Sequence, residues 1–95
     1  MDIVAVGNVN IDLIFAPTPS MPRWGEELLV SNFEMRLAGS AGYFAIASAK
    51  LGTECGLVAS VGDDVYGDFM LRELRRERIK ARVSVERKIS SGICV

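Results

Sequence analysis

Residues 38–52, with the sequence AGSAGYFAIASAKLG, are the stretch that best indicates the fold. They open with small residues around two glycines and continue as an alanine-rich apolar run that ends at Gly52. A glycine after the last turn and a cation such as Lys50 near the carboxyl end are both typical of a helix terminus. We therefore predict a helix over residues 42–51 that follows a small-residue loop. Because this helix has almost no polar face, it should lie in the interior of a larger structure.

Apolar segments on both sides of this helix predict buried strands. Residues 2–9 (DIVAVGNV) and 55–61 (CGLVASV) are short and mostly apolar without alternation, which is typical of a parallel sheet. A second, amphipathic helix is expected over residues 65–78, with an aspartate of the preceding Gly-Asp-Asp turn accepting hydrogen bonds from its first amides. Residues 81–85 and 91–95 are expected to be further strands. This order predicts an α/β domain with right-handed crossovers between parallel strands.

The segment between the first strand and the first helix has a different character. All three prolines of the chain fall within residues 17–22, and proline cannot donate to a strand ladder, so a loop is expected there. Residues 27–37 show an imperfect apolar alternation that predicts an extended stretch leading back towards the core. We expect a small flap of strands in this part of the chain.

The composition restricts the classes of function. Ninety-five residues, 49% of them hydrophobic and 24% charged, suffice for one small globular domain. No apolar run approaches the ~20 residues needed to span a bilayer, and the amino end lacks a signal peptide's basic region, so a cytoplasmic protein without a membrane partner is expected. Without histidine, neither a zinc site nor a histidine-dependent nucleophile is expected. The two cysteines, Cys55 and Cys94, should be buried free thiols.

Basic side chains are concentrated near the carboxyl end. Residues 72–88 carry eight basic and three acidic side chains, whereas the net charge of the whole chain is −1. Such a basic block can bind nucleic acid. The spacings of Asp68 to Arg72 and of Glu73 to Arg76 indicate instead ion pairs on a solvated helix face, without the interleaved aromatic residues of single-strand binders. We therefore expect no nucleic-acid partner.

The small-residue loop before the first helix has two physical interpretations. The free amides at a helix start can bind an oxygen-rich ligand, and small side chains let that ligand approach closely. Alternatively, the glycines only let a buried helix pack close to a strand. The chain lacks both the P-loop pattern and the G-x-G-x-x-G of a dinucleotide-binding site. Asn10 and Asp12 follow the first predicted strand, at the sheet edge where ligands bind in open α/β sheets.

Five segments, taken in order, resemble the amino-terminal third of the ribokinase-like (PfkB) carbohydrate kinases. They are VAVGNVNIDLIF, a P-x-x-G-E-E stretch, AGSAGYFAIASAKLG, GLVASVGDDVYGDFMLRELRRERI and SSGICV. The resemblance covers essentially all 95 residues and implies a central, mostly parallel sheet flanked by helices, with a small lid of β-strands. Residues 14–37 and 91–95 match that lid, which in several members also forms a dimer contact, so a homodimer through the lid is implied. Residues 1–95 would then be the N-terminal part of a kinase domain.

The same resemblance implies an acceptor site. Asn10 and Asp12 match positions that hold hydroxyls of the sugar, and a carboxylate suits this role because it can accept from two hydroxyls at once. Gly39, with Ala38 before it, matches the family's di-glycine, which lines the sugar and serves as a hinge for lid closure. Closure would exclude water that would otherwise hydrolyse the nucleotide.

Two positions depart from the family pattern. Ser40 stands where ribokinases often have lysine, and Tyr43 where they usually have a sugar-binding asparagine. A tyrosine brings a ring that can stack on a sugar or a base, together with one hydroxyl. We expect Tyr43 to shape the acceptor pocket, which leaves a nucleoside, a hexose or a sugar acid as the substrate. In the alternative interpretation, Tyr43 is a helix residue packed in the core.

By resemblance, the whole enzyme would transfer the γ-phosphoryl group of Mg-ATP to a hydroxyl of a sugar, sugar derivative or nucleoside. ATP and Mg²⁺ would bind mainly outside these residues, since nothing here matches the family's D-T-x-G-A-G-D motif. We therefore expect no catalytic residue and no metal ligand among residues 1–95, and no activity of this part alone. The alternatives are a non-catalytic α/β binding or dimerisation module and, against the missing glycine fingerprint, a dinucleotide-binding domain.

Overall fold

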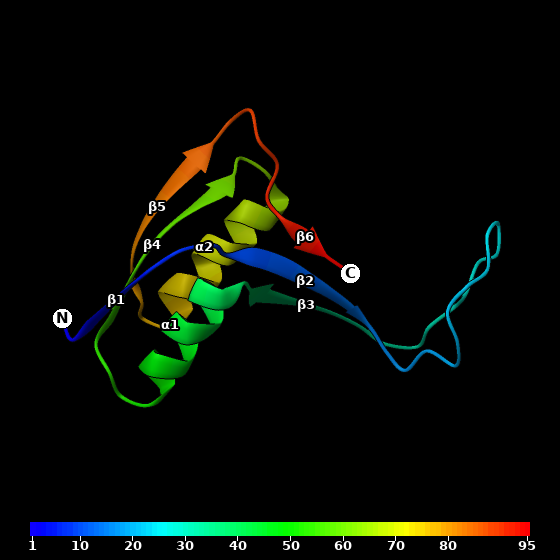
Figure 1. Ribbon diagram of the computed structural model, residues 1–95, viewed down its shortest axis with the longest axis horizontal. Helices are drawn as coiled ribbons and strands as arrows, with labels where there is room; N and C mark the ends of the chain where they lie inside the picture. Colours follow the sequence, from blue (N-terminus) through cyan, green and yellow to red (C-terminus); the bar gives the residue numbers. More distant parts are fainter.

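The computed structural model describes residues 1–95 as two three-stranded sheets and two helices (Figure 1). In chain order, the elements are β1 (Ile3–Val6), β2 (Asn10–Phe15), β3 (Phe33–Ala38), α1 (Ser40–Lys50), β4 (Cys55–Gly62), α2 (Val65–Arg76), β5 (Lys80–Glu86) and β6 (Ile93–Cys94). These strands and helices, with a parallel sheet at the centre, confirm the predicted α/β class.

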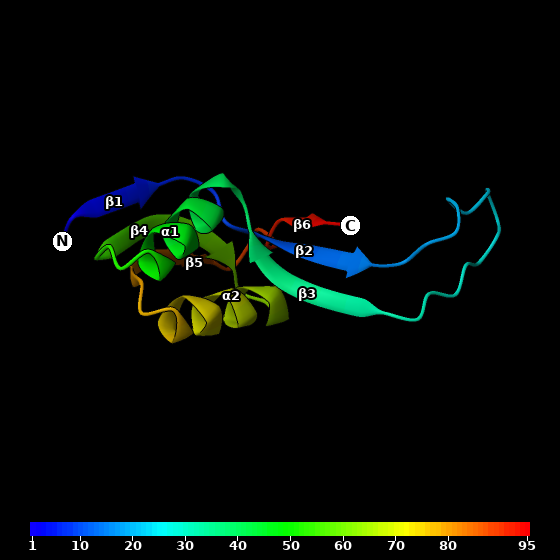
Figure 2. The ribbon, with the colours of Figure 1, turned by 90° about the horizontal axis from the view of Figure 1, so that it is seen from below.

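The first sheet has the order β1-β4-β5 and is parallel throughout. Both helices cover the same face of this sheet (Figure 2). The connections β1-α1-β4 and β4-α2-β5 both move across the sheet in the same direction. When two such connections have the same handedness, their helices lie on the same face of the sheet. The core between the sheet and the helices is formed mainly by Ala5, Leu57, Val61, Ala45, Met70 and Leu74. On the opposite face of the sheet, Val4, Val6 and Val58 are exposed.

The second sheet has the order β3-β2-β6, with β2 antiparallel to β3 and parallel to β6. It projects away from the first sheet and the helices, and residues 16–32 form a long loop at its far end (Figure 1). The extended stretch expected before α1 is a strand only from Phe33 onward. Ile11 and Leu37 are buried where this sheet joins the core. Cys94 is exposed because β6 is an outer strand, so the expectation of two buried thiols is wrong for this residue.

The predicted first strand, residues 2–9, is too long. β1 ends at Val6, and β2 begins at Asn10. Asn10 and Asp12 still follow the carboxyl end of β1, as expected, but they belong to the next strand, β2. The apolar pattern continues across the junction because Val9 belongs to the same core as β1. Local periodicity consequently cannot reveal where the chain passes from one sheet to the other.

The helix α1 begins at Ser40, two residues before the expected start. Gly52 has a φ of 88°, as expected for a glycine just after the last turn. Only one side of α1 is covered in this chain, and Phe44 on its outer side is 49% exposed. That α1 lies in the interior of a larger structure therefore stays a prediction, since within these 95 residues the first sheet covers it from one direction only.

The helix α2 ends at Arg76, two residues earlier than expected. The Asp64 carboxylate accepts a hydrogen bond from the backbone amide of Gly67 at 2.8 Å, which confirms the predicted aspartate cap. Of the two expected ion pairs along this helix, only that between Glu73 and Arg76 forms, with a separation of 2.6 Å.

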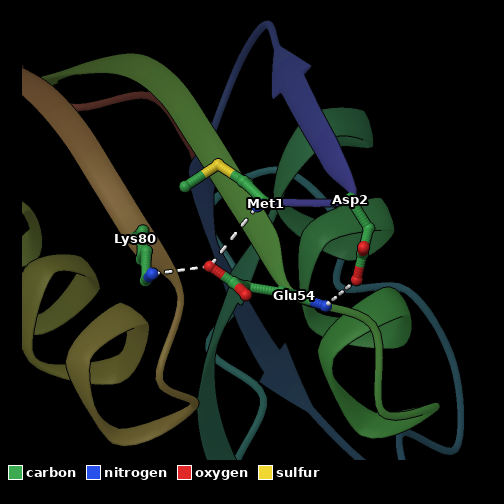
Figure 3. A network of polar contacts seen from close by, with 4 residues as sticks. All are labelled: Met1, Asp2, Glu54 and Lys80. Carbon is green, nitrogen blue, oxygen red and sulfur yellow. Dashed lines mark hydrogen bonds and ion pairs between the residues drawn. The ribbon is translucent and has the colours of Figure 1, made fainter.

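A polar network lies where the strands of the first sheet begin (Figure 3). The Lys80 ammonium and the amino group of Met1 lie 2.5 and 3.7 Å from the same carboxylate oxygen of Glu54. The Asp2 carboxylate accepts from the Glu54 amide at 3.0 Å. Lys80 and then the amino terminus lower the pKa of Glu54. Since this edge is opposite to the carboxyl ends of the strands, we assign the network to the alignment of β1, β4 and β5.

Candidate functional site

The residues predicted to bind an acceptor come together where β2 and α1 both begin. Asn10, the first residue of β2, pairs with Ala38, the last residue of β3, in the antiparallel register. The loop through Gly39 therefore passes beside the start of β2 and leads directly into α1. This places Asn10 and Asp12 on one side of the site, and Ser40 and Tyr43 on the other.

Gly39 occupies a position that only glycine fits. Its φ of 90° lies in the region that residues with a Cβ atom avoid. A Cβ atom there would lie 2.6 Å from the carbonyl oxygen of Asn8 and 2.8 Å from Oδ1 of Asn10. A Cβ atom at Gly42 would lie 2.7 Å from the side chain of Leu37. Both glycines thus serve close packing, the second of the two interpretations, and the first also shapes the polar site.

A chain of hydrogen bonds connects the polar side chains of the site. The Ser40 hydroxyl donates to Oδ1 of Asn8 at 2.9 Å. The Asn8 amide donates to Oδ1 of Asn10 at 3.5 Å, and the Asn10 amide to Oδ1 of Asp12 at 3.4 Å. The Tyr43 hydroxyl donates to the other carboxylate oxygen of Asp12, Oδ2, at 2.7 Å. Of these contacts the last is the shortest, and it joins α1 to β2.

Tyr43 lies at the surface and is not packed in the core of this chain. It is 51% exposed, and its hydroxyl reaches Asp12 on the neighbouring sheet. The hydrogen bond to Asp12 raises the pKa of Tyr43, and partial burial and the negative charge of Asp12 raise it further. The shift reflects that this hydrogen bond favours the neutral phenol as the donor.

Two charged residues that the sequence analysis did not single out share the site. In the β2–β3 register, Arg36 lies directly opposite Asp12. Glu34 is two residues before Arg36 on β3, so its side chain lies on the same face of the sheet. The guanidinium of Arg36 binds both carboxylate oxygens of Glu34 at 2.9 Å. This contact raises the pKa of Arg36. Alternation along β3 puts both residues on one face, but only the register shows that they adjoin Asp12.

A groove next to the site runs between β3, α1 and α2. It has a volume of about 580 Å³, with apolar side chains such as Leu37, Ile46 and Phe69 and charged ones such as Arg36 in its lining. Tyr43 borders this groove and also contacts Asp12. The ring of Tyr43 is thus placed between a polar cluster and a partly apolar surface.

Two features of these residues are unfavourable for a metal ion and for a phosphate group at the start of α2. Residues 1–95 contain no group of three or more histidine, cysteine, aspartate or glutamate side chains that could hold a metal. The start of α2 is capped by the carboxylate of Asp64, which would repel a phosphate. Asn8, Asn10, Asp12, Ser40 and Tyr43 offer amide, carboxylate and hydroxyl groups, a set suited to the hydroxyls of a small polar molecule.

Comparison with known proteins agrees with this fold. Residues 1–95 match the pfkB family carbohydrate kinases. The chain is 36% identical to a deoxyribokinase of Salmonella typhi over 74 residues, which are 78% of this chain and 24% of that protein. It is 35% identical to a 2-dehydro-3-deoxygluconokinase of Thermoproteus tenax over 94 residues, which are 98% of this chain and 27% of that protein.

A solved structure has the same arrangement of elements. An uncharacterized sugar kinase from Pyrococcus horikoshii, in complex with ATP, matches with a TM-score of 0.80 and 27% identity, over 96% of this chain and 28% of that one. The chain thus spans about a quarter of the length of the relatives that it matches. Neither helix has the length and apolar character needed to cross a membrane. Because the family match extends over every residue, the chain belongs to the pfkB family of carbohydrate kinases.

Proposed function

We propose that residues 1–95 are the N-terminal, acceptor-binding part of an ATP-dependent kinase that phosphorylates a hydroxyl of a sugar, sugar derivative or nucleoside. The observation that carries this proposal is the meeting of Asp12, Asn10, Ser40 and Tyr43 at one site in a member of this family. The names of the two relatives, deoxyribokinase and 2-dehydro-3-deoxygluconokinase, support a small sugar or sugar acid as the acceptor.

In this proposal, Asp12 is the main acceptor ligand. Its carboxylate can accept from a hydroxyl of the substrate and thereby orient the reacting hydroxyl. Asn10 and Ser40 lie close enough in the hydrogen-bonded chain to add weaker polar contacts. None of these groups serves as the catalytic base, which we assign to the part of the protein beyond these residues.

ATP and Mg²⁺ are also assigned to that part. The chain spans only about a quarter of its relatives, and one matching sugar kinase has ATP bound. ATP supplies the phosphoryl group, and the residues described here would hold the acceptor in position for it. We expect the complete kinase to work in the cytoplasm.

The second sheet, with the loop that connects β2 to β3, is proposed as the lid. Residues 14–37 and 91–95 include the last two residues of β2, all of β3 except Ala38, and β6. Gly39 lies at the junction between β3 and α1, where a change in backbone angles would move the sheet relative to the helix. Closure would remove water from the acceptor site.

The lid is also proposed as the surface of a homodimer. Its exposed apolar side chains are Phe15, Met21, Trp24, Leu29, Phe33, Ile93 and Val95. The rings of Phe15 and Phe33 contact each other, with centroids 5.1 Å apart. Apolar groups of this kind on a projecting sheet fit a contact between copies better than contact with water.

The test is a phosphorylation assay of the complete protein with Mg-ATP and a panel of sugars, sugar acids and nucleosides. The variant Asp12→Ala should lower kcat/KM for the acceptor about a hundredfold, since hydrogen bonds to a charged group contribute about 1.5–3 kcal/mol each. KM for ATP should change little. The matched control is Asp68→Ala, which removes an exposed carboxylate on α2 that makes no ion pair. Unchanged acceptor kinetics in Asp12→Ala would remove Asp12 from the site.

A second candidate is a non-catalytic binding or dimerisation module. The exposed apolar side chains of the lid favour it. The intact mass of the natural protein separates the two candidates. A mass several times the 10.3 kDa of these residues supports the kinase, whereas a mass near 10.3 kDa supports the module.

A further inference from the structure

We propose that two copies of this chain associate along the free edge of β3, where their β3 strands pair in an antiparallel register about a twofold axis at Met35. In this register, Glu34 of each copy lies opposite Arg36 of the other. Phe33 of each copy lies opposite Leu37 of the other. The proposal rests on the homodimer of the proposed function and deepens it, because it names the strand, the register and the side chains in contact.

The strand β3 has one edge without a backbone partner. It is an outer strand of the second sheet and pairs only with β2. Among the backbone hydrogen bonds outside helices and strands, none involves residues 33–38. Both helices approach β3 at its carboxyl end, and the rest of the strand projects away from them (Figures 1 and 2). An exposed edge of this kind can pair with a strand of another chain.

The groove between β3, α1 and α2 follows this open edge. Residues 34–37 all line the groove. Their side chains alternate between the two faces of the sheet, and side chains of both faces meet only at a strand edge. The groove therefore gives a second strand access to β3 from the side that β2 does not occupy.

The charges on β3 are complementary to those of a second β3. Glu34 and Arg36 are both exposed on one face, where they form an ion pair within the strand. Opposite charges directly across an antiparallel pair are stabilising, whereas like charges are destabilising. Charged side chains often keep an edge strand from pairing, but here a twofold axis at Met35 brings opposite charges together twice. A shift by two residues would place Glu34 opposite Glu34 or Arg36 opposite Arg36, so the charges also select the register.

The other face of β3 supplies an apolar contact. Phe33 is 60% exposed and lies on the same face as the buried Leu37. Leu37, Ile46 and Phe69 are apolar side chains of the groove. In the proposed register, Phe33 of the second copy lies next to these side chains, and its ring is removed from water.

The pairing closes with two copies. A twofold interface uses the same surface on both chains, so the two β3 edges cover each other and leave none free for a third copy. The lids then form one continuous sheet. Since Arg36 lies opposite Asp12 in the β2–β3 register, the charged row of the interface continues into the candidate acceptor site.

The first experiment measures the dimer dissociation constant of the complete protein by analytical ultracentrifugation. Glu34→Arg leaves two arginines on this face of β3, and Arg36→Glu leaves two glutamates. Each variant alone should dimerise at least about tenfold more weakly than wild type. An equimolar mixture of the two should recover dimers, because every cross-strand pair is then opposite in charge. Neither variant keeps the ion pair within the strand, so this recovery reports on the contact between copies.

The matched controls are Asp68→Arg and Arg72→Glu, at exposed positions on α2 that do not line the groove. Neither should change the dissociation constant. If the β3 variants dimerise as tightly as wild type, or if their mixture recovers no dimer, the edge pairing is wrong, and a lid dimer through other side chains stands. A monomeric wild type would overturn both the edge pairing and the lid dimer. The phosphorylation assay tests the kinase proposal separately, so its failure is distinguishable from these outcomes.

A second measurement does not depend on the charge variants and decides the case if they do not fold. Met35 lies opposite itself in the proposed register, with Cα atoms about 4.5–5.5 Å apart, a separation that a disulfide can bridge. Met35→Cys, in a Cys94→Ala background, should therefore give a covalent dimer under mild oxidation. Phe33→Cys in the same background lies opposite Leu37 and should stay uncross-linked. Equal cross-linking of the two variants, or none in Met35→Cys, would overturn the register.

Discussion

At the scale of single residues, Gly39 is the glycine that combines a positive φ with a close approach of neighbouring backbone. Three glycines have a positive φ, but their surroundings differ. A Cβ atom at Gly25 or Gly52 would meet nothing within 4 Å, whereas at Gly39 it would overlap the backbone of Asn8. Gly39 therefore combines an unusual backbone angle with a close approach, and it does so at the entrance to the candidate site.

We predict that Gly39→Ala destabilises the complete protein more than Gly52→Ala does. The control carries only the strain of a positive φ, about 1–2 kcal/mol. Gly39→Ala adds a contact of 2.6 Å with a backbone oxygen, which the chain can relieve only by moving the start of β2 or of α1. The measurement is the free energy of unfolding in denaturant for both variants. Equal losses would mean that the close approach at Gly39 carries no energetic weight.

The residues of the site could be predicted only in part. Asn10, Asp12, Ser40 and Tyr43 were indicated by the resemblance to the family, and they do come together. The hydrogen bond from Tyr43 to Asp12 could not be predicted, because it joins residues 31 positions apart through the packing of α1 against β2. Asn8, Glu34 and Arg36 were missed for a similar reason, since their neighbours depend on a turn and on a strand register that local patterns do not specify.

At the scale of elements, one hydrogen-bonded cluster ties the second sheet to the start of α2. The Asp64 carboxylate accepts from the Ser91 amide at 2.8 Å and from the Ser91 hydroxyl at 2.7 Å. The same hydroxyl accepts from the amide of Gly62 at 2.9 Å. Ser91 is buried and lies just before β6. Asp64 is thus both the cap of α2 and the anchor of the segment that leads into the proposed lid.

This cluster predicts a specific dependence of stability on pH. Hydrogen bonds from Ser91 and then from the amide of Gly67 lower the pKa of Asp64. A carboxyl whose pKa is lower in the folded state stabilises that state above its unfolded pKa of about 3.9, and this contribution is lost as the pH falls through the folded pKa. Asp64→Asn should therefore lower the free energy of unfolding at pH 7, and the difference from wild type should shrink below about pH 4.

The measurement is denaturant unfolding of the complete protein between pH 3 and pH 7. The control is Asp63→Asn, at an exposed neighbour whose carboxylate makes no hydrogen bond. A difference between wild type and Asp64→Asn that stays constant over this range would show that the charge of Asp64 does not contribute.

The elements themselves were largely predictable, whereas the division into two sheets was not. The helix α1 and the strand β4 follow from their apolar runs and from the glycine after α1, and α2 follows from its amphipathic pattern and from the aspartate before it. The junction between β1 and β2 was missed because Val9 continues the apolar run from one sheet into the other. Tertiary contacts decide that boundary, and they leave no mark in a short window of sequence.

At the scale of the whole molecule, the first sheet is covered on one face only. β4 is its central strand, yet Val58 in the middle of that strand is 41% exposed, and Val6 beside it in the register is 76% exposed. All-parallel sheets are almost always covered on both faces. The chain spans about a quarter of its relatives, so we propose that the remainder of the kinase covers this face.

The last prediction tests that arrangement with a charge placed on the uncovered face. Val58→Asp should lower the free energy of unfolding of the complete protein by about 3 kcal/mol or more, because it would bury an unpaired carboxylate between the sheet and the covering segment. The control is Val65→Asp, at the exposed first residue of α2, where an acidic side chain is compatible with the helix dipole and should change stability by about 0.5 kcal/mol or less. Equal tolerance of the two substitutions would mean that this face of the sheet meets water, and that the rest of the kinase packs elsewhere.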